Sequence, residues 1–171
     1  WLTVNSSQNQ QFSNNKSFVN KSNDVLVILP MITALAYEKN GFYDYYSKIC
    51  GTECLSVKIQ EPKYNFASSF TAIVTLTGQM NYEAISDVEL HQILLIDKQY
   101  LGKYRKIILL HNEYVTEQIF NAVTNHNKTI YLYPNALYAR VELSNGVITL
   151  IRGHGYPESE ISNGFGWEFD N

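Results

Sequence analysis

The sequence predicts a three-layer α/β domain with a mainly parallel sheet, helices on both faces and a β-hairpin at the C-terminal end. Two continuous apolar runs rich in β-branched residues, VLVILPMI and RKIILL, are typical of strands buried on both faces. Strand-like segments alternate with helical ones, as they do in βαβ units. Two alternating runs around Ser144-Asn145-Gly146 are the strongest hairpin signal in the chain.

Residues 1–23, WLTVNSSQNQQFSNNKSFVNKSN, form a polar, low-complexity leader without helical or strand periodicity. Such a composition cannot bury enough apolar surface to offset the entropy that is lost on ordering. We therefore expect its few hydrophobic side chains to dock on the domain, on a neighbouring copy of the chain or on another surface protein. Residues 24–171 are expected to form one α/β domain, because a chain of 171 residues fits a single core.

The first half of the domain begins with the buried strand VLVILPMI. The next segment, TALAYEKNGFYDYYSKIC, predicts a helical or part-helical stretch that ends near Gly51, with Asn40-Gly41 as the candidate break. CLSVKI predicts a second strand, and QEPKYNFASS predicts a loop around Pro62. FTAIVTLTG fits either a strand or a short helix.

The second half continues the alternation. YEAIS predicts a strand that ends at Asp87, ILLIDKQYLGKY a helix or a helical turn, and RKIILL the second buried strand. TEQIFNAVTNH has apolar residues at helical spacing and Glu117 in its first turn, where the helix dipole favours a carboxylate. TIYLY predicts a further strand that Pro134 stops, and the hairpin follows.

Composition and motifs argue against several classes of function. The net charge is −3 and acidic and basic residues are interspersed, so we expect no basic surface for a nucleic acid. No apolar run reaches the roughly 18 residues that span a bilayer. The sequence has no G-x-G-x-x-G or Walker-type nucleotide loop, no G-x-S-x-G nucleophile elbow and no H-E-x-x-H zinc motif.

Glycosylation sequons and two cysteines favour an extracellular or cell-surface location. The Asn-X-Ser/Thr sequons, which predict a glycoprotein, are at Asn5, Asn15, Asn20 and Asn127. Cys50 and Cys54 lie in CGTEC, where a reversal of the backbone would bring the two Cα atoms within about 7 Å and allow a disulfide. Two reduced, half-buried thiols are the alternative, and a metal site is less favoured because a second ligand pair is missing.

Polar side chains follow the predicted strands, at the positions where open parallel sheets bind ligands. These segments are residues 30–38, 62–64, 87, 111–114 and 133–135. In KIILLHNEYVTEQIF the buried strand stops at His111, and a polar cluster precedes the next helix. His154 in RGHGYP is expected in a turn whose flanking glycines would let it approach a site, whereas His91 and His126 are expected on the surface.

The segment YLGKYRKIILLHNEYVT resembles the strand-end motif of class I glutamine amidotransferase-like domains, in the version found in the C-terminal domain of the N,N-dimethylformamidase large subunit. LPMITALAYEKNGFY is similar to the first strand and the Tyr-containing loop of that family, and LSVKIQEPKY to its second strand and the Pro-Tyr that follows. The similarity covers residues 24–135 and implies a flavodoxin-like arrangement of the three layers.

In that family two tyrosinates and a glutamate hold a mononuclear ferric iron that polarises an amide and activates water. By position, the resemblance implies Tyr37, Tyr64 and Glu113 as the ligands, with His111 as acid/base and Asn112 nearby. Phenolate and carboxylate are hard oxygen donors that suit Fe(III). Each residue also has a structural interpretation: the tyrosines as packing groups, Glu113 as a helix N-terminal carboxylate and His111 as a hydrogen-bonded strand-end histidine.

Two functions follow from this resemblance. Asn112 stands where the family has an acid, and the arginine that precedes the family's Pro-Tyr is absent from EPKY. We therefore predict an extracellular interaction or structural module that keeps the scaffold without the complete catalytic machinery and binds glycans, surface proteins or copies of itself. The alternative is an iron-dependent amide hydrolase related to N,N-dimethylformamidase, in which His111 and Glu113 are catalytic.

Overall fold

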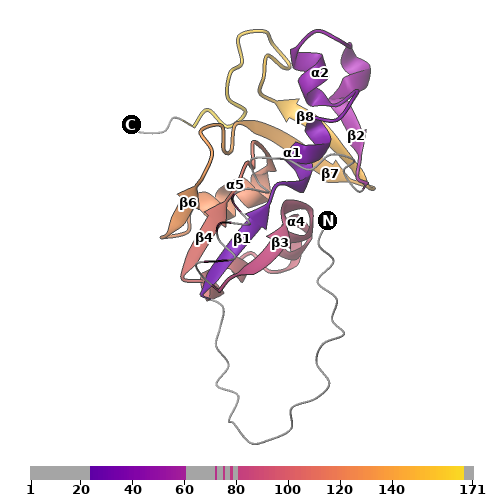
Figure 1. The fold of residues 1–171 in the computed structure, drawn as a ribbon. Coiled ribbons are helices and arrows are strands. Elements are labelled where there is room, and N and C mark those ends of the chain that lie inside the picture. The colour runs from indigo at the N-terminus through magenta and orange to yellow at the C-terminus, as the bar shows by residue number, and fades with distance from the viewer. Residues whose placement is uncertain (1–23, 61–71, 73–74, 76–77, 79–80, 168–171) are drawn as a thin grey trace, which may run out of the picture.

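The computed structural model describes residues 24–60, 72, 75, 78 and 81–167, which form two four-stranded sheets (Figure 1). Sheet A has the strand order β3-β1-β4-β6, and its described pairs are all parallel. Its strands are β1 (Val25–Leu29), β3 (Glu83–Ser86), β4 (Lys106–Leu109) and β6 (Thr129–Tyr131). The fold is therefore mixed α/β with a mainly parallel sheet, as the alternation of segments predicts.

Sheet B contains the predicted hairpin and has the order β2-β8-β7-β5. Its strands are β2 (Ser56–Lys58), β5 (Tyr114–Thr116), β7 (Ala139–Ser144) and β8 (Val147–Arg152). β7 and β8 are antiparallel and are joined by Asn145 and Gly146, whose φ angles are 51° and 74°. Two-residue hairpin turns of type I′ require positive φ at both positions, which is why Asn-Gly marked this turn in the sequence.

The structure differs from the prediction in the placement of CLSVKI. This segment is not a second strand of the parallel sheet, because β2 pairs antiparallel with β8 in sheet B. Its three residues alternate between exposed and half-buried, which suits a short strand with one solvated face. The hairpin forms sheet B together with β2 and β5.

Short helices connect the strands. They are α1 (Met31–Ala36), α2 (Phe42–Tyr46), α4 (Asp87–Ile96) and α5 (Glu117–Thr124), with 3-10 turns η1 (Thr52–Leu55) and η2 (Tyr100–Lys103). α1 and α2 are separated at Asn40-Gly41, where Asn40 has a φ of 62°, so the predicted break is confirmed. α4 begins with a capping box, in which Ser86 Oγ accepts from Glu89 N and the Glu89 carboxylate accepts from Ser86 N.

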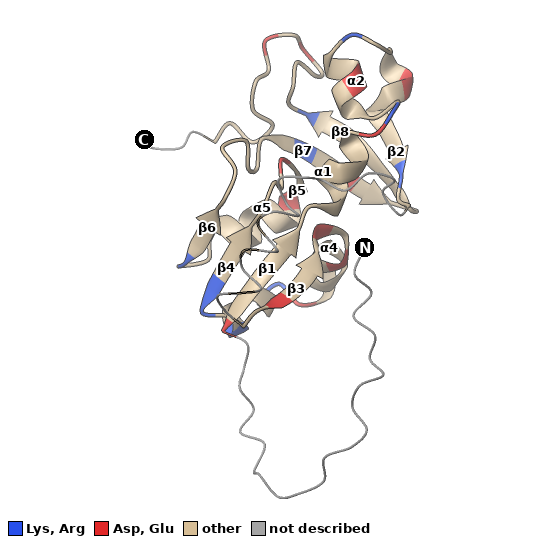
Figure 2. Cartoon of the chain, in the orientation of Figure 1, with Lys and Arg blue, Asp and Glu red and all other residues tan. Residues whose placement is uncertain are grey.

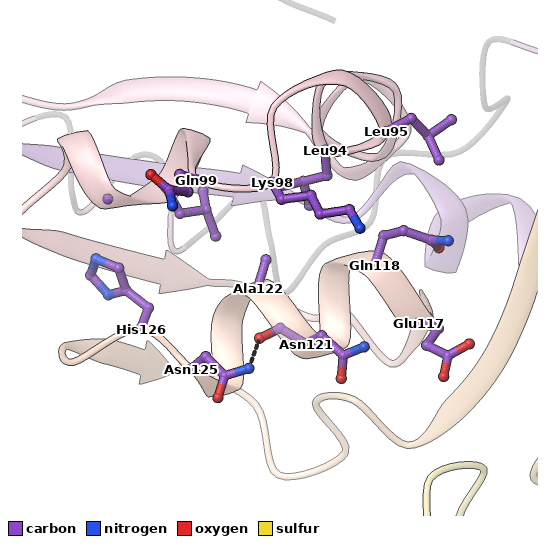
Figure 3. A pocket seen from close by; sticks show the side chains of 12 residues that line it. Leu94, Leu95, Lys98, Gln99, Glu117, Gln118, Asn121, Ala122, Asn125 and His126 are labelled. Carbon is purple, nitrogen blue, oxygen red and sulfur yellow. Dashed lines mark hydrogen bonds between the residues drawn. The ribbon is translucent and has the colours of Figure 1, made fainter.

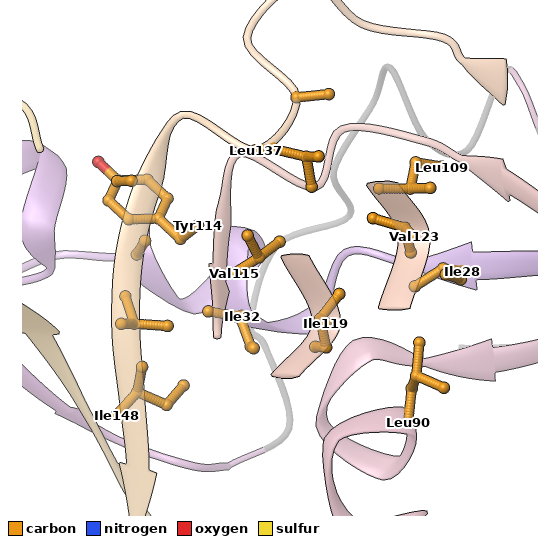
Figure 4. Packing of buried hydrophobic residues seen from close by; sticks show 14 of the residues in the cluster. Ile28, Ile32, Leu90, Leu109, Tyr114, Val115, Ile119, Val123, Leu137 and Ile148 are labelled. Atoms are coloured by element: carbon orange, nitrogen blue, oxygen red, sulfur yellow. The ribbon is translucent and has the colours of Figure 1, made fainter. Parts of the chain in front are cut away.

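One continuous core joins the two sheets (Figure 4). Ile28 of β1 and Leu109 of β4 belong to the same cluster as Leu90 of α4, Val123 of α5 and Ile148 of β8. Alternate residues of the same strands form a second cluster with Ala72 and Tyr82, whose buried members are Val25, Val27, Ile108 and Leu110. Since side chains alternate across a strand, β1 and β4 are buried on both faces, as their continuous apolar runs predict.

Several surface features bear on the predicted location. Cys50 and Cys54 form a disulfide, with their Cα atoms 6.2 Å apart. Asn127 is exposed in the turn between α5 and β6, whereas the leader of residues 1–23 with its three sequons lies outside the described residues. Acidic and basic residues are spread over both sheets and the helices (Figure 2). In the part of the chain that the structure describes, no helix has the length and hydrophobicity needed to cross a bilayer.

Replacement of Gly164 by alanine is expected to destabilise the domain, because a Cβ at this position would collide with the backbone of both hairpin strands. It would meet Arg152 O and lie 2.5 Å from Arg140 N, while Gly164 N donates to Tyr138 O at 2.8 Å and prevents relief. We expect the free energy of unfolding, measured in urea, to fall by about 1–3 kcal/mol. In the control, Gly102→Ala, the new Cβ meets no atom within 4 Å, so equal effects of the two changes would contradict this interpretation.

Candidate functional site

The candidate site lies at the carboxyl end of sheet A, beside its topological switch point. β3 and β4 flank β1 on opposite sides. The chain therefore runs from β1 to β3 on one side and later returns to β4 on the other, so the strand order reverses between β1 and β4. Open parallel sheets bind ligands at such a point. The chain leaves β4 here and enters β5 of sheet B, so residues 110–113 link the two sheets.

Glu113 is the centre of this site. Its side chain is 1% exposed, and three side chains from separate segments contact its carboxylate. Tyr37 Oη donates to Oε2 at 2.8 Å, His111 Nε2 lies 3.2 Å from Oε2, and His154 Nε2 lies 2.7 Å from Oε1. We call these four residues the Glu113 cluster. The two imidazole contacts are close but lie off the ideal hydrogen-bond direction, so they are mainly electrostatic pairs.

The contacts in the Glu113 cluster keep the buried carboxylate ionised. Burial would raise the pKa of Glu113. The interactions of His111, His154 and Tyr37 with its carboxylate outweigh this effect and lower the pKa to about 2. Burial, followed by the charge of Glu113, raises the pKa of Tyr37, so its phenol stays protonated and donates. The cluster therefore combines a fixed negative charge, a phenol and two imidazoles, which is a combination suited to proton transfer.

The backbone of Glu113 is held by hydrogen bonds to α1 and to the start of β7. Thr33 Oγ1, in α1, accepts from Glu113 N at 3.0 Å and from Tyr114 N at 3.2 Å. On the other side, Glu113 O accepts from Tyr138 N at 2.9 Å and from Ala139 N at 3.0 Å. These bonds explain how the carboxylate keeps its position at the junction between the sheets.

A second buried carboxylate braces the segment that carries the cluster. Asp87, at the start of α4, is fully buried and accepts from Ile32 N at 3.0 Å and from Asn112 Nδ2 at 3.2 Å. Asn112 Oδ1 in turn accepts from Leu110 N at 3.0 Å. Burial raises the pKa of Asp87 to about 7, although these hydrogen bonds oppose the rise. Asp87 therefore ties the ends of β1, β3 and β4 together behind Glu113.

Aromatic rings surround the imidazoles of the cluster. The ring of His111 lies 3.5 Å from that of Tyr133, between centroids. His154 lies among three tyrosine rings, with centroid distances of 5.1 Å to Tyr46, 5.2 Å to Tyr114 and 4.4 Å to Tyr138. Several of the tyrosines in this sequence therefore surround the two imidazoles that contact the buried charge of Glu113.

The structure brings together several of the residues that the strand-end pattern selected. Tyr37, His111 and Glu113 meet in the cluster, whereas Tyr64, the third residue in the implied ligand set, lies outside the described residues. Asn112 is fully buried and serves as a brace. Glu113 is not a solvated helix N-terminal carboxylate, because α5 begins four residues later and is capped by Thr116.

Two histidines are placed differently from the prediction. His91 is not on the surface: it is 4% exposed, and its Nδ1 pairs with Thr116 Oγ1 at 3.0 Å. His126 is half-buried, with Nε2 3.0 Å from Tyr104 O. His154, which was expected in a turn able to approach a site but was not among the implied site residues, does reach the cluster; its φ is 52° and follows Gly153 at 120°. The Gly-His-Gly run in the sequence indicates this placement, since glycines allow the turn that directs the His154 side chain inwards.

The fit of the site to a metal ion rests on its oxygen donors. Tyr37 and Glu113 offer phenolic and carboxylate oxygens 2.8 Å apart, a donor type that suits a hard trivalent cation. Among the described residues, no group of three or more His, Cys, Asp and Glu side chains is arranged to hold a metal. The described chain therefore supplies two of the three implied ligands.

Two hollows in the described surface lie away from the Glu113 cluster. One, of about 910 Å³, is an open groove between α4, η2 and α5 (Figure 3). Leu94, Lys98 and Gln118 are among the side chains that line it. The smaller, of about 250 Å³, lies beside it against β7. Neither contains a buried ionisable cluster of the kind that marks catalytic sites, so the Glu113 cluster is the stronger candidate.

Comparison of the chain with protein-family models and with curated proteins finds no match.

Proposed function

We propose that the chain is a hydrolase of carbonyl compounds, acting on C–N or ester bonds at the Glu113 cluster. The observation that carries this proposal is the convergence of Tyr37, His111 and His154 on one almost fully buried carboxylate at the switch point of a parallel sheet. A buried ionised carboxylate costs several kcal/mol unless its partners compensate, so such an arrangement is uncommon without a function.

In the proposed reaction Glu113 orients the imidazoles and does not itself take the proton, since a carboxyl group with a pKa of about 2 is a weak base. A carboxylate beside Nε2 favours the tautomer that is protonated at Nε2, and this makes Nδ1 the basic nitrogen. His111 or His154 would then accept a proton from the attacking water and return it to the leaving amine or alcohol. The pairing has the logic of an Asp–His pair in a hydrolase.

The resemblance to N,N-dimethylformamidase supports a place for ferric iron in the proposed site. Tyr37 and Glu113 would hold it together with Tyr64, and the ion, when bound, would polarise the substrate carbonyl and activate water. The strand order of sheet A, which is second-first-third-fourth along the chain, supports a flavodoxin-like arrangement as well. The disulfide and the exposed Asn127 sequon support an extracellular location.

A second candidate function is the extracellular interaction or structural module. It is favoured by the burial of Glu113, which is 1% exposed and does not line either of the two hollows described above. In this case the cluster would serve as a buried polar joint between the sheets, and the chain would bind glycans, surface proteins or further copies of itself. Buried ionic groups can specify a structure in this way.

The two functions are separated by assay of the purified full chain on formamide, N,N-dimethylformamide, acetamide and p-nitrophenyl acetate. We expect the wild type to hydrolyse at least one of these compounds, and we expect the rate to fall at least about 100-fold in Glu113→Gln. Glu142→Gln, an exposed glutamate on β7, is the matched control and should keep full activity. Iron content, measured by mass spectrometry, should be stoichiometric in the wild type and lost in Glu113→Gln if the metal is part of the site. A wild type without hydrolysis would favour the module instead.

A further inference from the structure

Tyr114 carries a buried hydroxyl group that the described part of the chain leaves without a hydrogen-bond partner. The side chain is 0% exposed, and its hydroxyl has no hydrogen-bond partner among the described residues. Figure 4 shows the ring at the edge of the apolar core, with its oxygen pointing away from the labelled aliphatic side chains. Buried hydroxyl groups are nearly always hydrogen-bonded, because the loss of water without a replacement destabilises the fold. A phenylalanine would pack here without that cost, so the hydroxyl requires another explanation.

The position of Tyr114 links this hydroxyl to the Glu113 cluster. Its ring stacks on that of His154, with centroids 5.2 Å apart and an interplanar angle of 29°. It also lies edge-on to Tyr37, at 6.5 Å and 81°. Tyr114 N is held by Thr33 Oγ1, the same atom that fixes Glu113 N. The phenol is therefore built into the same rigid junction as the proposed reaction centre.

The contacts of the Glu113 cluster leave the Tyr114 hydroxyl without a partner among the described residues. Glu113 itself is already contacted by Tyr37 and the two imidazoles. Both imidazole Nε2 atoms lie beside the Glu113 carboxylate, whereas the Tyr114 O–H has no acceptor among the described residues.

We propose that the Tyr114 hydroxyl binds the carbonyl oxygen of the substrate and stabilises the oxyanion that forms on it. This inference rests on the proposed hydrolase function and adds a substrate contact to it. A donor aimed at the oxygen where charge develops is worth more in a water-excluded site than in solution. The ligand class is a neutral amide or ester, whose carbonyl oxygen is an acceptor without a donor of its own.

The step balances without any further reactant. The oxygen of water bonds to the carbonyl carbon while one imidazole takes its proton, and the C=O π pair moves onto oxygen, where Tyr114 donates to it. The pair then returns to re-form the C=O bond, the C–N or C–O bond breaks, and the leaving group takes the proton from the imidazolium. Tyr114 keeps its proton throughout, which fits its role as a donor that stabilises charge.

The test is Tyr114→Phe in the full chain, with Tyr100→Phe as the control. Tyr100 lies in η2 and its hydroxyl pairs with Tyr104 Oη at 3.3 Å, so this control removes a satisfied hydroxyl away from the cluster. We expect kcat for amide or ester hydrolysis to fall about 100-fold or more in Tyr114→Phe, with KM changed much less, and to stay unchanged in Tyr100→Phe. We also expect Tm to be equal or higher in Tyr114→Phe, because an unpaired hydroxyl has been removed.

A binding measurement keeps this inference separate from the proposed function. The chain is labelled with 13C at the ζ carbon of tyrosine for NMR spectroscopy. The signal that is absent from the spectrum of Tyr114→Phe belongs to Tyr114, and we expect added acetamide to shift this signal in the wild type. If the wild type hydrolyses nothing but acetamide shifts this signal, the hydrolase proposal fails and the carbonyl contact stands. Wild-type kcat in Tyr114→Phe, a marked fall of its Tm, or a signal that acetamide does not move would each overturn the inference.

Discussion

Replacement of Glu113 by glutamine is expected to lower the free energy of unfolding by about 3 kcal/mol at pH 7. The folded pKa of Glu113 is lowered to about 2 from its ordinary value of 4.5. A carboxyl group with a lowered folded pKa stabilises the fold above its unfolded pKa, and this contribution is lost as the pH falls through the folded pKa. Glutamine imitates the protonated carboxyl group, so the variant lacks the contribution at every pH.

The pH dependence of unfolding provides the sharper measurement. Urea denaturation of the wild type between about pH 5 and 2 should show a steep loss of stability, and Glu113→Gln should show a shallower one. The two curves should approach each other near pH 2, where the wild-type carboxyl group is also protonated. Glu142→Gln, with its exposed side chain, should follow the wild type. Parallel curves for the wild type and Glu113→Gln over this range would show that the cluster does not hold an ionised carboxylate.

The second large effect is expected at Asp87. Asp87→Ala would leave Ile32 N and Asn112 Nδ2 buried without their acceptor, and an unsatisfied buried donor costs about 1–3 kcal/mol. We expect a loss of about 2–4 kcal/mol in the free energy of unfolding, measured in urea at pH 5. The structure behind Glu113 should loosen as well, because Asn112 then has no bond to hold it against α4.

The loss in Asp87→Ala should depend on pH in a direction opposite to that of Glu113. The folded pKa of Asp87 is raised to about 7 from its ordinary value of 3.8, so its contribution is fully present below the unfolded pKa and disappears as the pH rises through 7. The cost of Asp87→Ala should therefore be larger at pH 5 than at pH 8. Asp97→Ala, at the exposed end of α4, is the control. An equal cost at both pH values would contradict the raised pKa.

Local rules account for the elements that were predicted correctly. β1 and β4 were identified from continuous apolar runs, because a strand covered on both faces has no polar alternation. The hairpin followed from Asn145-Gly146, whose backbone demands are met by few other residue pairs. The start of α5 followed from Glu117 in its first turn, and Thr116 caps it. Each of these signals lies within a few residues of the feature that it predicts.

The composition of the site depends on pairings that are distant in the chain. The resemblance and the strand-end rule selected Tyr37, His111 and Glu113, because parallel strands bring their carboxyl ends to one edge. His154 reaches Glu113 only because β5 pairs with β7, and β7 with β8, which places the turn after the hairpin against the end of β4. β2 was misplaced for the same reason, since its partner β8 lies some 90 residues further along the chain.

From its residues alone the chain could be recognised as α/β, with its two central strands, its terminal hairpin and the strand end where a charged cluster lies. Burial and backbone geometry determine these features locally, so composition and spacing reveal them. The ionised state of Glu113, the brace formed by Asp87 and the unpaired hydroxyl of Tyr114 arise only in the folded chain. Each is the sum of desolvation and contacts from segments far apart in sequence, and these act on one another only after the two sheets have packed.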